Sequence, residues 1–250
     1  MAPRYDAVLF DLDNTLWHFN DAPPWHEVAA AFAPRIQATI ERWGQQSSLS
    51  YAELDMRLLE AEQAALDVTM AADYREPDMA AAVVDELARH GVVATLDQAH
   101  ELRHVVRPDP TILRPRLFDG VVEALEQLRS SGVRLAAVTN RSHGATVLAD
   151  ELEHHGLASA FDAVVVAADI GWRKPHPAMV EHALAQLDVT AARALMVGDR
   201  ANRDVEAANT AGVTSVLARH PGMPESPIAG PHQQPDHHVE SMAELLALLN

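Results

Sequence analysis

Two aspartates one residue apart, Asp11 and Asp13, follow the short apolar run of residues 5–10. In an extended segment, residues i and i+2 point to the same side, so both carboxylates can reach one small substrate atom. One carboxylate can attack that atom while the other moves a proton, because two acids in different environments can divide these tasks. The triplet Asp13-Asn14-Thr15 is also typical of an ordinary turn, so this pair alone leaves both interpretations open.

Further polar side chains follow other short apolar runs later in the chain. These runs cover residues 133–138, 163–167, 194–197 and 213–217, and each is closed by a polar or glycine turn. Such runs are typical of buried parallel strands, and ligands bind beyond the carboxyl ends of the strands in open α/β sheets. The polar residues at or beyond these ends are Thr139, Asn140, Lys174, Asp199 and Asp204.

The carboxylates in this set indicate a bound cation. Placed together without compensation, they would repel one another by an amount on the order of several kcal/mol at an intermediate dielectric. A hard divalent cation removes this repulsion, and oxygen ligands without histidine or cysteine favour Mg²⁺ over zinc. We therefore expect a magnesium ion at this edge of the sheet.

Lys174 is unusual in the composition of the chain. Of the 19 lysine and arginine residues, 18 are arginine and Lys174 is the single lysine. An ammonium is a compact point charge and a guanidinium is a planar fork, so the two are not interchangeable at a tight site. The count alone does not distinguish function from drift, and the neighbours of Lys174 must decide between them.

Helical patterns separate the apolar runs. Apolar spacing predicts helices from residue 121 up to Gly132, at 144–155, 177–187 and 202–211, and a final helix at 242–249 after a short strand. Strands that alternate with helices of about ten residues form right-handed βαβ units. The sequence therefore predicts the α/β class, with a doubly wound parallel sheet.

Residues 21–112 interrupt this alternation. They contain no convincing strand, and they predict helices near 24–44, 50–71, 77–90 and 97–106. A structureless loop of this length is implausible inside a compact domain, so we expect a helical unit that folds separately. Its polar edges, residues 20–24 and 107–115, contain proline and are expected to be the two strands of a hinge.

Together these residues resemble the haloacid dehalogenase superfamily, and its phosphatase branch in particular. Residues 11–15 match the first motif, DxDxT, and Thr139-Asn140 matches the second. Arg173-Lys174-Pro175 matches the third motif, and residues 198–204 match the fourth, GDx4D. The four motifs occur in the family's order, and the resemblance covers residues 5–20 and 113–245. It implies a Rossmann-like core of residues 1–20 and 113–250, with a helical cap domain of residues 21–112 inserted after the first strand.

The resemblance also implies a role for each motif residue. Asp11 would attack phosphorus and become an aspartyl-phosphate, while Asp13 would protonate the leaving alkoxide and then activate water. Mg²⁺ would be held by Asp11, by the backbone carbonyl of Asp13 and by Asp199, with Asp204 in support. Phosphoryl oxygens would be bound by Thr139, Asn140 and Lys174. This context favours a functional role for the single lysine.

Asp13 separates the branches of the superfamily. The resemblance implies that dehalogenases lack an aspartate at this position, because a halide leaves without a proton. The expected activity is therefore Mg²⁺-dependent hydrolysis of small phosphorylated metabolites. Two alternatives stay open: a phosphomutase, which passes the phosphoryl group to a sugar phosphate, and a module that binds a phosphorylated ligand without turnover. The intact set of Asp11, Asp13, Lys174 and Asp199 argues against the second alternative.

Four side chains beside the motifs are candidate contacts for the rest of the substrate. Trp17 and His18 follow the first motif, Arg141 follows the second, and Trp172 precedes the third. Core packing is the competing interpretation for the tryptophans, and a solvated loop is the competing one for Arg141.

Composition limits the remaining classes. The net charge of −17 disfavours nucleic-acid and membrane-surface partners, because an acidic surface repels phosphate groups. With no cysteine, the chain has no disulfide, thiolate nucleophile or zinc–thiolate site. No apolar run approaches the roughly 20 residues that span a bilayer. We expect a cytoplasmic protein that acts on a small phosphorylated metabolite, as a monomer in preference to a homodimer.

Overall fold

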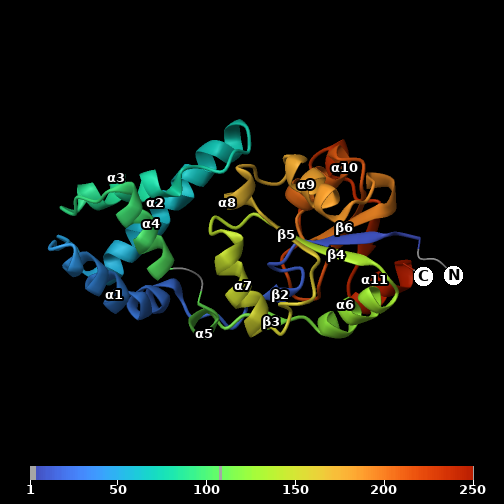
Figure 1. The fold of residues 1–250 in the computed structure, drawn as a ribbon, viewed down its shortest axis with the longest axis horizontal. Helices are drawn as coiled ribbons and strands as arrows, with labels where there is room; N and C mark the ends of the chain where they lie inside the picture. The colour runs from blue at the N-terminus through green and yellow to red at the C-terminus, as the bar shows by residue number, and fades with distance from the viewer. Residues whose placement is uncertain (1–3, 107–108, 250) are drawn as a thin grey trace. The chain divides into compact units, whose positions relative to one another are not determined.

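The computed structural model describes residues 4–106 and 109–249, and it divides into two compact units. The first unit combines Met1–Phe19 with Pro115–Asn250, and the second is Asn20–Arg114. The first contains the sheet, and the second is helical (Figure 1). Each unit has hydrophobic clusters built from its own residues.

The sheet of the first unit has six parallel strands. In spatial order they are β5 (Ala163–Val166), β4 (Arg134–Thr139), β1 (Ala7–Phe10), β6 (Ala194–Gly198), β7 (Thr214–Ala218) and β8 (His237–Val239). The chain runs outward from β1 through β4 to β5, and then returns to β6 on the other side of β1. This reversal of strand order is the point at which open α/β sheets bind ligands. The predicted doubly wound parallel sheet is confirmed.

Helices cover both faces of this sheet. The side chains of the central strand β1 alternate between two hydrophobic clusters, one on each face. Val8 and Phe10 pack in the cluster that contains residues of α6 (Val121–Ser130), α7 (Ala145–His154) and α11 (Met242–Leu249). Ala7 and Leu9 pack in the cluster that contains residues of α9 (Ala178–Leu187) and α10 (Glu206–Thr210). Figure 1 shows α9 and α10 on one side of the strands, with α6 and α11 on the other.

The described residues of the second unit form four longer helices and one short one. They are α1 (Trp25–Arg42), α2 (Tyr51–Ala72), α3 (Met79–Arg89), α4 (Leu96–Val105) and α5 (Pro110–Leu113). Capping boxes begin two of them, with Ser50 and Glu53 at α2, and Thr95 and Gln98 at α4. An apolar cluster drawn from α1 to α4 forms the core of this unit.

Some short elements depart from the sequence prediction. Strand β2 (Trp17–His18) pairs antiparallel with β3 (Arg116–Leu117), joining the two chain segments that lead into and out of the helical unit. The helix expected at 202–211 begins with a π-helical turn, η2 (Ala201–Val205), and only then continues as α10. The described part of the first unit also contains the short helices α8 (Ala167–Ile170), η1 (Ala191–Arg193) and η3 (Pro231–Gln233).

Candidate active site

A pocket of about 150 Å³ lies beyond the carboxyl ends of β1, β4 and β6. It brings together all seven of the predicted motif residues that were assigned to catalysis, metal or phosphate: Asp11, Asp13, Thr139, Asn140, Lys174, Asp199 and Asp204. Asn14, Arg200 and Arg203 complete its lining. Adjacent parallel strands end at the same edge, which is why residues so far apart in the sequence meet here.

The turn after β1 presents the Asp11 carboxylate. The backbone N–H groups of Thr15 and Leu16 both donate to the carbonyl of Leu12, and Asn14 takes a left-handed conformation at φ 61°. Asparagine tolerates this conformation better than most residues. The hydroxyl of Thr15 donates to Asp11 Oδ2 at 3.2 Å, so the turn also holds one carboxylate oxygen.

Lys174 is buried and its ammonium is fully hydrogen-bonded. Its Nζ lies 2.6 Å from each of three acceptors, which are Asp11 Oδ1, Asp204 Oδ1 and the carbonyl oxygen of Val138. An ammonium has three donors, so these contacts use all of them. The predicted contact of Lys174 with phosphoryl oxygens therefore requires the exchange of one of these bonds.

The segment that carries Lys174 is held by Asn140. The N–H of Lys174 donates to Asn140 Oδ1 at 2.7 Å, and Asn140 Nδ2 donates to the carbonyl of Lys174 at 2.9 Å. Arg173 donates to the carbonyl of Asn140 at 2.5 Å and to Ser142 Oγ at 3.0 Å, which joins the same two loops again. The structure thus gives the Asn140 amide a positioning role, and its contact with phosphate stays a prediction.

The turn after β6 places Asp199 and Asp204. Asp204 Oδ2 accepts the backbone N–H of Arg200 at 2.9 Å, and Asp199 Oδ2 lies 3.3 Å from Arg200 Nε. Asp204 packs against the backbone of Gly198 so closely that a Cβ there would meet the Asp204 side chain at 2.3 Å. The π-helical turn that carries Asp204 is of a kind often found at functional sites.

Asp11, Asp199 and Asp204 form the acidic cluster of this pocket. Each offers one carboxylate oxygen, and these oxygens lie within 4.8 Å of one another. Burial raises the pKa of Asp11 to about 8, with Lys174 opposing the rise and Asp204 adding to it. Burial likewise raises the pKa of Asp199 to about 6, again with a contribution from Asp204. A cation would stabilise these crowded carboxylates, and a set of oxygen donors fits Mg²⁺.

Asp13 is held by two donors on one oxygen. Trp17 Nε1 donates to Asp13 Oδ1 at 2.9 Å, and Arg141 Nη2 donates to the same atom at 2.6 Å. Arg141 also makes two bonds to Glu151, at 3.1 Å and 2.9 Å. The side chain of Asp13 is therefore fixed at the edge of the pocket, while the acidic cluster itself is formed without it.

Comparison with known proteins identifies the family. A family model described as haloacid dehalogenase-like hydrolase matches residues 5–212. The chain belongs to this family of hydrolases.

Two curated relatives of this haloacid dehalogenase-like hydrolase match nearly the whole chain. A ribulose-1,5-bisphosphate 5-phosphatase of Halopiger xanaduensis is 27% identical over 98% of this chain and 99% of its own. A glyceraldehyde 3-phosphate phosphatase of Methanopyrus kandleri is 30% identical over 96% of this chain and 95% of its own. Among solved structures, a 2-haloacid dehalogenase of Pseudomonas syringae pv. Tomato superposes with a TM-score of 0.66, at 24% identity and 98% coverage of both chains. That likeness shows the fold alone.

The four side chains outside the motifs that were predicted to contact substrate have different surroundings in this hydrolase. The side chain of Trp17 is fully buried and stacks on His155 at 4.7 Å, as the core-packing interpretation expects, and its contact with substrate stays a prediction. Arg141 was also expected to reach the substrate, but its side chain is only 16% exposed and binds Asp13 and Glu151. Trp17 Nε1 and Arg141 Nη2 both donate to the carboxylate of Asp13, so these two side chains hold Asp13 in place.

His18 and Trp172 pack on neighbouring rings. His18 lies 5.0 Å from Phe118, and Trp172 stacks on His176 at 3.8 Å. Neither is among the described residues that line the pocket, and their contact with substrate stays a prediction.

The pocket residues Arg200 and Arg203, and Glu151 beside Asp13, were not among the predicted site residues. The two arginines lie inside the GDx4D motif, so the motif itself was a signal for them. Glu151 lies on α7, ten residues after Arg141, and no local pattern marks it as a partner of Asp13.

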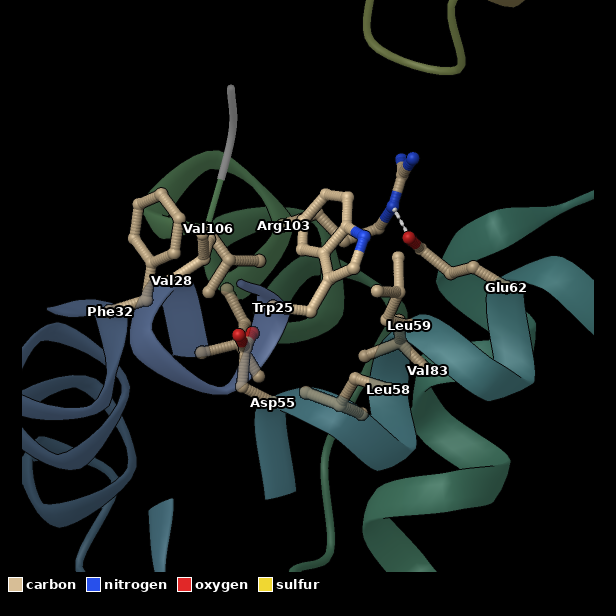
Figure 2. Close-up of a pocket in the computed structure, with 11 residues that line it drawn as sticks. Trp25, Val28, Phe32, Asp55, Leu58, Leu59, Glu62, Val83, Arg103 and Val106 are labelled. Atoms are coloured by element: carbon tan, nitrogen blue, oxygen red, sulfur yellow. Dashed lines mark hydrogen bonds and ion pairs between the residues drawn. The ribbon is translucent and has the colours of Figure 1, made fainter. Parts of the chain in front are cut away.

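The helical unit has a hollow of its own, of about 70 Å³ (Figure 2). Figure 2 shows the indole of Trp25 beside the ion pair of Arg103 and Glu62. In this pair, Arg103 Nε lies 2.5 Å from Glu62 Oε1. The side chain of Asp55 is part of the same hollow, and burial raises its pKa to about 6. The indole of Trp25 is 57% exposed.

Proposed function

We propose that this hydrolase cleaves phosphate monoesters of small metabolites in a Mg²⁺-dependent reaction through an aspartyl-phosphate on Asp11. The observation that carries the proposal is the arrangement around Asp11: a carboxylate at a strand end, paired with a buried lysine and clustered with two further carboxylates. The two relatives that match nearly the whole chain are named as phosphatases of small metabolites, which supports the same substrate class.

In the proposed reaction, an oxygen of Asp11 attacks phosphorus and the bond to the leaving alkoxide breaks. Asp13 gives its proton to that alkoxide, so the product leaves as an alcohol. Asp13 then takes a proton from water, the resulting hydroxide attacks the phosphorus of the aspartyl-phosphate, and Asp11 is regenerated with release of phosphate. General acid–base help of this kind contributes roughly 10²–10⁴-fold to a rate.

Asp11, Asp199 and the backbone carbonyl of Asp13 would hold Mg²⁺, with Asp204 in support. When bound, the ion shields the incoming phosphate from the charge of Asp11 and stabilises charge on the phosphoryl oxygens. Lys174 already pairs with Asp11, so it orients the nucleophile and adds positive charge where the phosphoryl group arrives. The hydroxyl of Thr139, at the end of β4, would bind a phosphoryl oxygen.

The presence of Asp13 favours phosphoryl transfer over dehalogenation, although a dehalogenase is among the structural relatives. A halide leaves without a proton, whereas an alkoxide needs one, so a fixed carboxyl beside the nucleophile has a task only in the second case. We also propose that the helical unit acts as a cap and that its residues set the substrate preference. The hollow beside Trp25 is the surface that supports this assignment.

Phosphate release tests the proposal. We expect Mg²⁺-dependent turnover of p-nitrophenyl phosphate, ribulose 1,5-bisphosphate, glyceraldehyde 3-phosphate or phosphoglycolate, and no turnover by Asp11→Asn. Turnover that survives in Asp11→Asn would show that the nucleophile is another residue. A folded protein that binds Mg²⁺ but is silent on the whole panel would contradict the proposal. A requirement for a sugar bisphosphate would favour the phosphomutase alternative instead.

A further inference from the structure

The two oxygens of the Asp13 carboxyl have different surroundings. Oδ1 accepts from both Trp17 Nε1 and Arg141 Nη2, at 2.9 Å and 2.6 Å. Among the described residues, Oδ2 has no hydrogen-bond partner, and the side chain of Asp13 is 35% exposed at the edge of the pocket. Both donors carry hydrogens toward Oδ1, so a proton on this carboxyl must sit on Oδ2.

Arg141 is itself held firmly by Glu151. The guanidinium makes two bonds to this carboxylate, whose side chain is 4% exposed, and only its Nη2 reaches onward to Asp13. A planar fork bound at two points has a fixed orientation, which a flexible ammonium could not provide. Helix α7, which carries Glu151, thereby determines where Arg141 Nη2 lies.

Arg141 lies between two carboxylates, with Nη2 on Asp13 Oδ1 and two bonds to Glu151. Because Glu151 holds the guanidinium at two points, the bond from Nη2 to Asp13 has a fixed direction and orients the Asp13 carboxyl. Trp17 adds a neutral donor on the same oxygen, and its ring is locked in the core.

We propose that Trp17, Arg141 and Glu151 are positioning residues that direct Oδ2 of Asp13 toward the leaving group. The proposal rests on the proposed phosphohydrolase function. In the first half of the reaction the Oδ2–H bond breaks and the O–H bond of the product alcohol forms. In the second half a bond of water to hydrogen breaks, the proton returns to Oδ2, and the hydroxide binds phosphorus as Asp11 leaves.

Two substrates with different leaving groups separate positioning from structural support. p-Nitrophenolate leaves without a proton, whereas the alkoxide of an alkyl phosphate such as phosphoglycolate or glyceraldehyde 3-phosphate requires one. The constant to compare is kcat/KM, because it reports the steps up to leaving-group departure and excludes hydrolysis of the aspartyl-phosphate. A variant that only misplaces the proton donor lowers kcat/KM for the alkyl phosphate and spares it for p-nitrophenyl phosphate.

The variants are Glu151→Gln, Arg141→Lys and Trp17→Phe, each of which keeps most of the side-chain volume. We expect each to lower kcat/KM for the alkyl phosphate by about tenfold or more, with p-nitrophenyl phosphate changed by no more than about twofold. Asp13→Asn gives the reference for complete loss of the proton donor. Arg193→Lys is the matched control, because Arg193 binds Asp6 through two bonds at 3.0 Å and 2.7 Å in the same unit, outside the pocket.

The possible outcomes distinguish a positioning role of these residues from a purely structural one. Equal losses on both substrates in a variant that melts like the parent would show a structural role only. No loss on either substrate would show that Asp13 is oriented by other groups. If Glu151→Gln fails to fold, Trp17→Phe removes a donor to the same oxygen and tests the same point. A parent enzyme that hydrolyses neither substrate would instead overturn the proposed function.

Discussion

At the scale of single residues, the acidic cluster makes the stability of the fold depend on pH, and it would do the same for the proposed metal binding. Burial raises the pKa of Asp11 from an ordinary 3.8 to about 8, and that of Asp199 to about 6. The folded state therefore binds these protons more tightly than the unfolded state does. Without metal, the free energy of unfolding contributed by these groups falls as the pH rises from about 4 to about 8.

We expect Mg²⁺ to reverse this loss, because a bound ion would take the place of the protons. We expect the rise in Tm on addition of Mg²⁺ to be larger at about pH 8 than at about pH 5, since ligand carboxylates must lose their protons to bind metal. Thermal melts with and without Mg²⁺ at the two pH values measure it. Asp199→Asn should reduce the rise at both. A rise of equal size at both pH values in the parent would contradict the assignment of the ion to this cluster.

Gly198 tests how tightly the cluster is packed. A Cβ on this residue would meet Asp204 Cβ and Cγ at 2.3 Å, so Gly198→Ala must displace the aspartate that pairs with Lys174. We expect a lower Tm and a loss of turnover of at least about tenfold, since breaking a buried ion pair is strongly destabilising. Gly230→Ala is the control, because a Cβ there meets nothing within 4 Å. Equal effects of the two substitutions would contradict this explanation.

At the scale of elements, the sequence predicted the helices and strands whose signal lies in residues that are close together in the chain. Continuous apolar runs located strands β1, β4, β5, β6 and β7 to within a residue or two, and apolar spacing placed the last helix at Met242–Leu249. The two-residue strands β2 and β3 have no periodicity, since each is too short to alternate and they pair across about a hundred residues. The π-helical turn η2 depends on contacts to Arg200 and Gly198 that no helical pattern encodes.

Local signals can also be tested by substitution, as at the start of α2. Ser50 Oγ accepts from the N–H of Glu53, and the Glu53 side chain binds back to the N–H of Ser50. Ser50→Ala removes half of this box and should lower the free energy of unfolding of the helical unit by about 1 kcal/mol. Denaturant unfolding measures it. Ser48→Ala is the control and should change little, because Ser48 donates its backbone N–H to the carbonyl of His90 while its side chain has no hydrogen-bond partner among the described residues.

At the scale of the whole molecule, the sequence predicted which strand ends carry the site residues. It did not predict the hydrogen bonds that connect these residues to one another. Asp11, Lys174 and Asp199 could be placed together because parallel strands end at one edge. The bond between Asp13 and Arg141 joins residues 128 apart in sequence, and its geometry depends on α7 packing on the sheet. Such contacts are fixed by tertiary packing, so the sequence alone could not show that Trp17 and Arg141 bind Asp13.

Within residues 4–106 and 109–249, no helix has the length and apolar character needed to cross a membrane.

The division into two units allows the proposed cap to be removed. Both hydrophobic clusters of the sheet unit consist of residues outside 20–114, and so does the acidic cluster. Strands β2 and β3 also bring the cut ends together, because His18 lies opposite Arg116 in an antiparallel pair. A linker of about two to four residues with an Asn-Gly turn can therefore close the chain as a hairpin.

We expect the shortened protein to keep its Mg²⁺-induced rise in Tm, since every residue of the acidic cluster remains. Slow turnover of p-nitrophenyl phosphate should also remain, because the nucleophile and Asp13 are untouched. The ratios of kcat/KM among the metabolite phosphates should fall toward one, because the surfaces that contact their different leaving groups would be gone. Trp25→Ala in the full-length chain is the milder companion, and it should change these ratios without changing the response to Mg²⁺. Unchanged ratios in the shortened protein would mean that substrate preference lies in the sheet unit, with the loops around the pocket as its source.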